Sequence, residues 1–364
     1  MVWQGDLRGW HRPCNAAGRR PPRLVPGNEK ASAKVRGLMT MSCSVSVVIP
    51  AFNSATTLPR AVHSIQQQGL QDYEVIIIDD GSTDPTGRVA REFATDKRIR
   101  VRSLPHNRGK PHAMNMAIAE ATGRWVAVLD ADDWYAENRL SALLAIGERN
   151  QAQIVADNQY LYDESADQVV CTAFPVSVGD RQLDKLSFAA GCDPYADFDM
   201  GMLKPIVRTD FIRQAQVTYR ENARLSEDFL YLLELLAAGA TGFVTAQPMY
   251  YWRQAFGSIS RRWTGTAGGE WRYDFLSGAR ANAEVLLSMR ERGEDMLARL
   301  LRRRMRAFYR LHQLQEVSRM RANGGTSTQL ATSILRHPSI WSLVVQRSVR
   351  RVTRRWESTS PIRA

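Results

Sequence analysis

Cysteine is scarce in this sequence. Four of the 364 residues are cysteine, and none belongs to a C-x-x-C pair: Cys14, Cys43, Cys171 and Cys192. Cysteines this far apart exclude a zinc cluster and a disulfide framework, and they favour a reducing compartment. Apolar runs of about 18 residues are also absent, so no transmembrane helix is predicted. Residues 1–36 have no apolar core, which excludes a secretory signal.

Acidic residues are scarce at both ends of the chain. Residues 1–41 hold eight lysines and arginines against two acidic residues, and residues 290–364 hold 17 arginines against five. Because the whole chain carries a formal charge of +12, residues 42–289 are net acidic. A nucleic-acid-binding core is expected to present a basic face, so no nucleic-acid partner is predicted.

The first 41 residues lack hydrophobic periodicity and are rich in proline, glycine and arginine. This composition predicts a disordered basic leader. Met39 and Met41 stand directly before the first apolar alternation, and we expect the true start codon to be one of them. N-terminal sequencing of the native protein tests this, because a peptide from residues 1–38 would contradict it.

Strands and helices alternate in the sequence from residue 44 to residue 150. Short β-branched or apolar runs predict strands at 44–49, 73–78, 99–103 and 125–129. Helical spacing predicts helices at 56–68, from 84 onward, at 110–122 and at 136–149. This alternation predicts an α/β fold, with a Rossmann-like, mainly parallel sheet flanked by helices.

Polar clusters follow three of these strands, at 50–53, 79–84 and 130–133. Parallel strands bring such clusters to one edge of the sheet, where ligands bind. The glycine-rich loops that hold phosphate in dinucleotide-binding and P-loop proteins are absent. Carboxylates repel a diphosphate unless a hard cation lies between them, and Mg²⁺ or Mn²⁺ suits one or two carboxylates plus substrate phosphates. The D-x-D turn of Asp130 and Asp132 therefore predicts a metal-bridged phosphate ligand, with a solvated turn as the alternative.

Four motifs occur in a fixed order along this segment: PAFN at 50–53, DDGSTD at 79–84, N-x-G-K-x-x-A-x-N at 107–115 and LDADD at 129–133. Together they resemble the family 2 glycosyltransferases of the GT-A fold, over roughly residues 44–260. The pattern FDMGMLKPIVRTDFI at 198–212 is most similar to bacterial exopolysaccharide transferases of the succinoglycan type. The resemblance implies a GT-A domain at 42–262 and a helical, arginine-rich extension at 263–364.

The resemblance also implies roles for individual residues. Asp132 is expected to be the main metal ligand, with Asp130 near the metal or the ribose, and Asp133 to bind metal or cap the next helix. Asp228 is expected to be the general base, and Glu227 to orient it or cap its helix. An acidic pair favoured by the helix dipole is the alternative for these two.

The nucleotide and the donor sugar are expected to contact a further set of residues: Pro50, Phe52, Asp79, Asp80, Asn107, Lys110 and Arg253. Among them, Asp80 with Asp79 would accept the N3–H of uracil and so select that base. Turn formation is the alternative for Asp79, and solvent exposure is the alternative for Lys110. Ser258 and Ser260 are weaker candidates of the same kind.

The implied reaction is an inverting, metal-dependent transfer of a hexose, with glucose expected, from a UDP-sugar. The acceptor would be a growing glycan or a lipid-linked oligosaccharide at the cytoplasmic side of the membrane. A catalytically inactive nucleotide-sugar-binding scaffold of the same fold is the alternative. A nucleotidylyltransferase is disfavoured because its early glycine-rich basic loop is missing.

The C-terminal segment 290–356 is predicted to be helical and basic. Its arginines, at 302–304, 306 and 310 and again from 347 to 355, flank a short apolar stretch that begins at Ile340, with Trp341 and Trp356 nearby. This pattern is typical of a helix that lies on an anionic membrane. A packed helical hairpin and a self-association helix are the alternatives.

Overall fold

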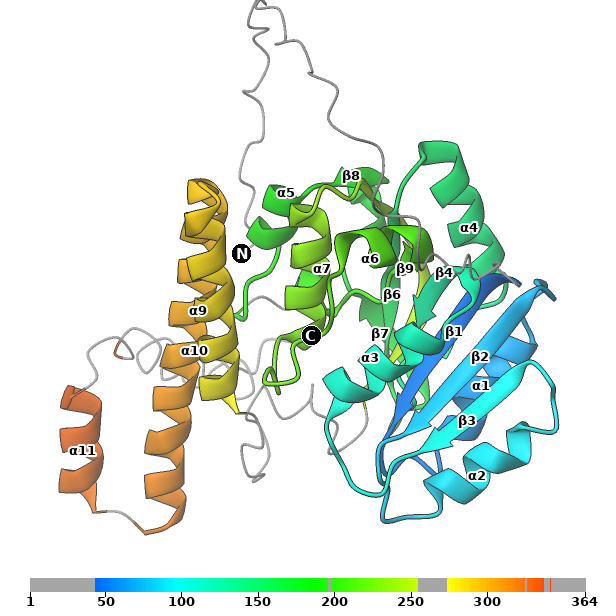
Figure 1. Cartoon of the computed structure of the whole chain (residues 1–364). Coiled ribbons are helices and arrows are strands. Elements are labelled where there is room, and N and C mark those ends of the chain that lie inside the picture. Colours follow the sequence, from blue (N-terminus) through cyan, green and yellow to red (C-terminus); the bar gives the residue numbers. More distant parts are fainter. Residues whose placement is uncertain (1–42, 196–197, 255–273, 325, 337–340, 342–364) are drawn as a thin grey trace, which may run out of the picture. The chain divides into compact units, whose positions relative to one another are not determined.

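The computed structural model describes the chain in several stretches: residues 43–195, 198–254, 274–324, 326–336 and 341 (Figure 1). All of them belong to one compact unit that begins at residue 40. The predicted leader, Ser258, Ser260, the predicted domain boundary at 262 and most of the apolar and basic segment after 336 lie outside the described residues.

One half of the sheet consists of parallel strands whose side chains alternate between two cores. In β1 (Cys43–Ala51), Val47 and Ile49 face one core, and Val48 faces the other. This two-residue period is what a strand buried on both faces requires. The strands of this half run in the order β3 (Ile99–Ser103), β2 (Tyr73–Asp79), β1, β4 (Gly123–Val128). Every pair is parallel, as predicted.

The other half of the sheet mixes strand directions. β4 continues through β9 (Ile206–Arg208) to β6 (Ile154–Asp163), with antiparallel pairing at both junctions. β6 then pairs in parallel with β10 (Gly242–Gln254), and β10 pairs antiparallel with β5 (Trp134–Tyr135). The short strands β7 (Gln168–Thr172) and β8 (Arg181–Leu183) are antiparallel neighbours of β6 and β10. In the described chain these ten strands form one sheet.

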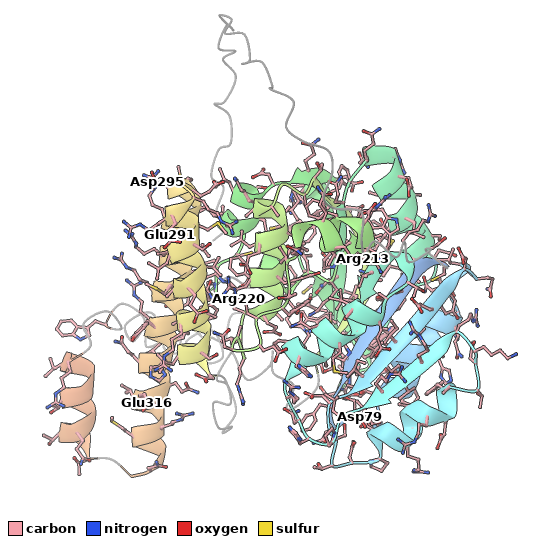
Figure 2. All side chains as sticks on the ribbon, in the orientation of Figure 1. Asp79, Arg213, Arg220, Glu291, Asp295 and Glu316 are labelled. Carbon is pink, nitrogen blue, oxygen red and sulfur yellow. The ribbon has the colours of Figure 1, made fainter. Side chains whose placement is uncertain are left out.

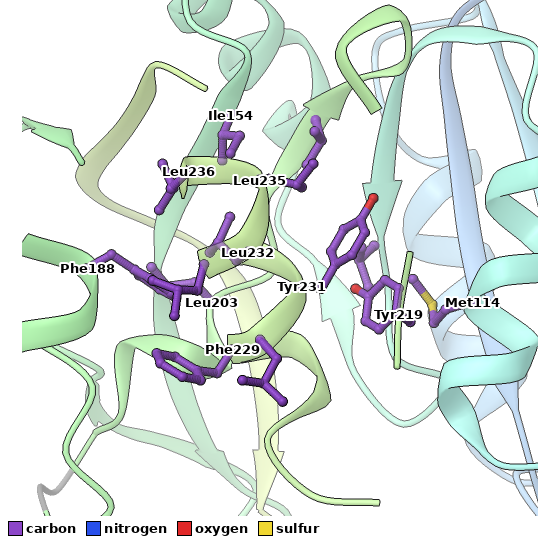
Figure 3. Packing of buried hydrophobic residues seen from close by; sticks show 14 of the residues in the cluster. Met114, Ile154, Phe188, Leu203, Tyr219, Phe229, Tyr231, Leu232, Leu235 and Leu236 are labelled. Carbon is purple, nitrogen blue, oxygen red and sulfur yellow. The ribbon is translucent and has the colours of Figure 1, made fainter. Parts of the chain in front are cut away.

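Helices cover both faces of this sheet (Figure 1). One face packs against α1 (Leu58–Gln66), α2 (Thr86–Phe93) and α4 (Arg139–Asn150). The other packs against α3 (Lys110–Glu120), α5 (Lys185–Ala190), α6 (Thr209–Ala215) and α7 (Glu227–Ala237). Figure 3 shows part of the core between the sheet and these last four helices, where the rings of Tyr219 and Tyr231 stack with their centres 4.1 Å apart.

The helix predicted at 136–149 begins three residues later than expected. Trp134 and Tyr135 form β5, and Asn138, which precedes the first residue of α4, has a left-handed φ of 58°. The prediction that Asp133 could cap this helix is therefore wrong, because Asn138 occupies the N-cap position.

The C-terminal segment contains a helical hairpin. α9 (Phe275–Glu291) and α10 (Asp295–Ala322) pack together, and α11 (Ser327–Arg336) follows them. Apolar residues of α9 and α10 belong to the same core as α7: Ala281, Val285, Met289, Leu297 and Leu301. Arg220, which Figure 2 labels, adds polar links, because it pairs with Glu234 of α7 at 2.7 Å and with Glu284 of α9 at 3.4 Å. Residues 275–322 thus form a packed hairpin, and the predicted segment 290–356 follows the packed-hairpin alternative as far as residue 322.

A buried ion pair holds α4 to the sheet. Arg139 donates to the carboxylate of Asp157 in β6 through Nε at 2.9 Å and through Nη2 at 2.6 Å. Neither side chain is more than 1% exposed. Removal of one partner leaves the other charge buried without compensation. We expect Asp157→Ala to lower the free energy of unfolding by roughly 3–5 kcal/mol. Urea denaturation measures this change.

A matched control is available at the surface. Arg208 and Asp210 also form a close pair, at 2.6 Å, but the Asp210 side chain is 55% exposed. Asp210→Ala should therefore change the free energy of unfolding by at most about 1 kcal/mol. Equal losses in the two variants would contradict the assignment of a structural role to the buried pair.

Candidate active site

Three polar turns meet at one edge of the parallel strands. The strand register places Ala51 at the end of β1 opposite Asp79 at the end of β2, and Val48 opposite Val128 at the end of β4. The backbone N–H of Asp80 also donates to the carbonyl of Ala51 at 2.8 Å. The predicted convergence of these strand ends is confirmed by the register.

Asp80 anchors the loop that precedes α3. Its side chain is buried, and its two carboxylate oxygens accept hydrogen bonds from the backbone N–H groups of Arg108 and Gly109, each at 2.8 Å. Each carboxylate oxygen has a second lone pair, so these bonds leave acceptor capacity. Asp79 accepts from the backbone N–H of Ser82 at 3.1 Å, so it stabilises its own turn.

Two lysines join the D-x-D turn to the start of α7. Lys110, the first residue of α3, lies 2.9 Å from Asp130 and 2.9 Å from Asp228. Lys204, which precedes β9, lies 2.8 Å from Asp130 and 2.6 Å from Asp228. The two aspartates are far apart in the sequence, but the same two ammonium groups bridge them. Lys110 is therefore not the solvent-exposed lysine of the alternative prediction.

The pKa values of these four groups follow from their pairing. Burial alone would raise the pKa of the Asp130 and Asp228 carboxyls, but Lys110 and Lys204 outweigh it and hold both below their usual range. Burial would lower the pKa of each lysine, and the two aspartates instead raise it. All four groups are therefore charged at neutral pH.

The neighbouring acids behave in the opposite way. Burial and the Asp130 carboxylate raise the pKa of Asp132. Burial and the Asp228 carboxylate raise the pKa of Glu227. Burial and the two preceding aspartates raise the pKa of Asp133 well above its usual range. The edge therefore carries more carboxylates than its two lysines can neutralise.

A divalent cation fits this excess of carboxylates. Asp132 forms no ion pair with a lysine or arginine of the described residues, whereas Asp130 forms two. Over the same residues, no three His, Cys, Asp or Glu side chains are grouped as a metal site. Asp132 and Asp130 are the candidate protein ligands of a cation at this turn, and further oxygens would have to come from phosphates and water, which is typical of Mg²⁺.

Asp133 has a structural role next to this turn. Its carboxylate accepts from the hydroxyl of Tyr250 at 2.7 Å and from the backbone N–H of Arg253 at 2.8 Å. The Tyr250 hydroxyl in turn accepts from the backbone N–H of Asp130 at 3.2 Å. These bonds tie β10 to the D-x-D turn. The Arg253 guanidinium pairs with Glu164, at 2.7 Å from its Nε.

Comparisons with known proteins identify the family of this chain. A model of the family "Glycosyl transferase family 2" matches residues 46–174. The succinoglycan biosynthesis protein ExoO of Rhizobium meliloti (strain 1021) is 32% identical over 306 residues, which cover 81% of this chain and 84% of ExoO. The chain belongs to the family 2 glycosyltransferases. ExoU, another succinoglycan biosynthesis protein of that strain, is 34% identical to this transferase over 203 residues, covering 54% of this chain and 58% of ExoU.

A solved structure supports the fold of the transferase. The crystal structure of residues 1–349 of S. aureus TarS in complex with UDP-GlcNAc has a TM-score of 0.52 to it, with 19% identity. The match covers 67% of this chain and 66% of the TarS chain. The transferase thus has the GT-A-type fold, with helices flanking a central sheet. None of the helices in its described part is long and apolar enough to cross a bilayer.

The remaining predicted nucleotide-binding residues of the transferase lie at the same edge or beside it. Pro50 is in β1 and is partly exposed, and Phe52, just after β1, is 45% exposed. Asn107 is exposed on the loop that Asp80 anchors. Their predicted contacts with a nucleotide remain predictions.

Lys204 is the residue that sequence reasoning missed. It stands in the pattern MGMLKPIV, where it is the one charged residue of an apolar stretch. A lysine in such a stretch is rarely buried without a partner. That rule could have identified Lys204 as an ion-pair candidate, but the pattern could not identify Asp130 and Asp228 as its partners.

Proposed function

We propose that this transferase moves a hexose, with glucose as the first candidate, from a UDP-sugar to a hydroxyl group of a growing bacterial glycan. One observation carries this proposal: Asp130 of the D-x-D turn and Asp228 of α7 share the same two lysines, so a donor-binding turn and a candidate base lie at one site. The names of the relatives ExoO and ExoU support an exopolysaccharide as the product. The TarS complex supports a nucleotide-sugar donor.

Asp228 is the proposed general base. An acceptor hydroxyl is a poor nucleophile until its proton is removed during attack. The proton passes to the Asp228 carboxylate, and the acceptor oxygen forms a bond to the anomeric carbon from the side opposite the diphosphate. The bond from that carbon to the phosphate oxygen breaks, and UDP leaves with the bonding electrons. A single displacement of this kind inverts the anomeric centre.

Asp132 and Asp130 are the proposed ligands of a divalent cation. A bound Mg²⁺ or Mn²⁺ would supply charge neutralisation for the diphosphate. Lys110 and Lys204 provide two further cationic groups at this edge. In the structure both lysines donate to one oxygen of the Asp228 carboxylate, Oδ2. A donor diphosphate would compete for them, and we propose that its binding draws them from Asp228 and leaves that carboxylate able to accept a proton.

The test is a screen of nucleotide sugars by UDP or other nucleoside diphosphate release, with Mg²⁺, with Mn²⁺ and with EDTA. We expect release from UDP-sugars, with UDP-glucose first, and loss of release in EDTA. Nucleotide binding without turnover of any donor would instead support the inactive scaffold. Equal turnover in EDTA would contradict the role given to the cation.

We also propose that the acceptor is lipid-linked and that the basic C-terminal part of the chain holds the enzyme at the inner face of the cytoplasmic membrane. In α10, Arg299 and Arg306 are exposed, and the nearby Met296 and Tyr309 are about half exposed. Basic and apolar side chains on one helix surface suit an anionic bilayer. The prediction needs one correction, because Arg304 of the same helix is buried.

Charge reversal tests this attachment. Each basic side chain near an anionic surface contributes about 1 kcal/mol, so Arg299→Glu with Arg306→Glu should lower binding to phosphatidylglycerol vesicles at least about tenfold. Sedimentation with vesicles measures the bound fraction. The matched control is Arg88→Glu with Arg91→Glu on α2, where both arginines are also exposed. Equal effects of the two double variants would contradict a specific surface on α10.

A further inference from the structure

Arg304 of α10 is a buried arginine on an otherwise apolar stripe. Leu297, Leu301, Phe308 and Leu311 follow one another at spacings of three, four or seven residues and are buried, and Arg304 falls on the same face. Its side chain is 5% exposed. A charge placed there needs partners, because burying an unpaired arginine is strongly unfavourable.

The partners of Arg304 lie beside the proposed active site. Its guanidinium pairs with Asp199 at 2.7 Å and donates to the carbonyl of Cys192 at 3.0 Å. Its other terminal nitrogen donates to the hydroxyl of Ser226 at 3.3 Å. The guanidinium carbon also lies 4.0 Å from the centre of the Phe229 ring in α7. The contacts with Ser226 and Phe229 reach the N-cap and the first turn of the helix that carries Asp228.

Ser226 is the residue directly before Glu227 and Asp228, and its backbone is unusual. It occupies the N-cap of α7 with φ 74° and ψ 14°, a left-handed conformation that costs a residue other than glycine about 1–2 kcal/mol. A serine at this position usually caps its own helix through its hydroxyl, but here no such bond forms. The hydroxyl oxygen instead faces Arg304 and the side-chain amide of Asn282 in α9, at 3.4 Å.

The segment before α7 is also packed closely against α9. A Cβ on Gly278 would lie 3.2 Å from Leu225, so this glycine permits the approach. The backbone N–H of Arg224 also donates to the hydroxyl of Ser277 in α9, at 3.1 Å. Leu225 packs with Phe275 of α9 and Phe308 of α10. Both helices therefore contact the residues that set the direction in which α7 begins.

From these contacts we propose that Arg304 is a positioning residue of the transferase site. It holds Ser226 in its strained conformation and so fixes Asp228 at the point where its carboxylate meets Lys204 and Lys110. The C-terminal helices are then part of the catalytic scaffold. This inference rests on the proposed role of Asp228 as base.

We expect replacement of Arg304 to slow the chemical step and to leave donor binding unchanged. Lys204 has an anchor that does not involve Arg304, because its backbone carbonyl accepts from Arg139 at 2.5 Å. Asp80 and Asp132 are carried by the strand ends. We therefore expect the donor-binding groups to keep their positions when Arg304 is replaced, and Asp228 to be displaced. Displacement of a reacting group by about 1 Å can cost roughly 10²-fold in rate.

The test compares Arg304→Lys with Arg303→Lys in the full chain. Lysine keeps the charge but cannot serve several acceptors in the plane of a guanidinium. Arg303 is the matched control, since its side chain is 73% exposed and pairs with Asp193 at the surface. With UDP-glucose as the probe, we expect Arg304→Lys to lower kcat for UDP release about 10²-fold with KM unchanged. Arg303→Lys should leave both constants as in the wild type.

Ser226→Ala provides a second route to the same result. It removes the hydroxyl and leaves the buried Arg304 paired with Asp199, so it remains informative if Arg304→Lys does not fold. We expect it to lower kcat as well. The losses of kcat in the two single variants should not add in the double variant, because both substitutions remove the same Arg304–Ser226 interaction. Unchanged kcat in both single variants, or a loss confined to thermal stability, would overturn the proposal.

Hydrogen exchange separates this inference from the proposed function. The backbone N–H of Leu230 donates to the carbonyl of Ser226 at 3.0 Å. Arg304→Lys should speed amide exchange in peptides that cover residues 226–233, and Arg303→Lys should not. A wild-type enzyme that releases no UDP from any donor would refute the proposed function, and the exchange comparison would still decide the positioning role. Equal exchange in the two variants would overturn it.

Discussion

Replacing Asp228 by asparagine is expected to abolish sugar transfer while UDP binding stays close to that of the wild type. Asparagine has the same shape, but it cannot accept the proton of the acceptor hydroxyl. General-base catalysis contributes about 10²–10⁴-fold to a rate, so a loss in that range is expected. Transfer is measured by UDP release, and binding is measured by calorimetry with UDP in the presence of metal.

The adjacent acid gives the control for this prediction. Glu227 is also in the first turn of α7, and Lys110 lies 3.8 Å from its carboxylate. Neighbouring residues of a helix point about 100° apart, so the two acids cannot serve the same atom. Glu227→Gln should therefore lose much less activity than Asp228→Asn. Substantial turnover by Asp228→Asn would remove this residue as the base.

Loss of the Asp228 charge also changes the lysine pair, and stability has to be measured for that reason. Lys204 is 7% exposed, and in this variant it would keep Asp130 as its anionic partner. Thermal unfolding of Asp228→Asn should show a folded protein of reduced stability. Loss of activity in a folded variant with intact UDP binding identifies a chemical role.

The parallel half of the fold could be predicted from sequence because its strands carry a strong local signal. β1 and β2 are runs of β-branched residues buried on both faces, and each is followed by a polar turn. The other half could not be predicted in the same way. β5 and β9 have two and three residues, which is too short to show a period. Their directions depend on pairing with distant strands.

The residues of the candidate site could be predicted where they follow a predicted strand, and not elsewhere. Asp130, Asp132 and Asp80 follow strands that the sequence predicts, so their shared edge could be predicted too. The contacts of Lys204 and Arg304 depend on segments whose path the sequence does not fix. For Arg304 a signal existed, because its spacing from Leu301 and Phe308 places it on the buried side of α10. A cluster of arginines in the sequence is more readily interpreted as a basic surface.

Replacing Asp132 by alanine is expected to remove the metal dependence of UDP binding together with sugar transfer. Asp132 has no ion pair among the described residues, and burial beside Asp130 raises its pKa. A divalent cation would relieve this repulsion. Its charge neutralisation is worth several kcal/mol to the transition state, so turnover should fall about 10³-fold or more.

Calorimetry with UDP in Mn²⁺ and in EDTA distinguishes the possible roles of Asp132. Wild-type binding should weaken in EDTA, and binding by Asp132→Ala should be weak in both solutions. Asp96→Ala is the matched control, because it also removes one carboxylate charge. Asp96 precedes β3, at the opposite end of the strands, and Arg98 holds the pKa of Asp96 at about 2. That variant should bind like the wild type. Metal-dependent binding that survives in Asp132→Ala would move the cation away from this carboxylate, and the D-x-D turn would then have to act through Asp130 and its two lysines.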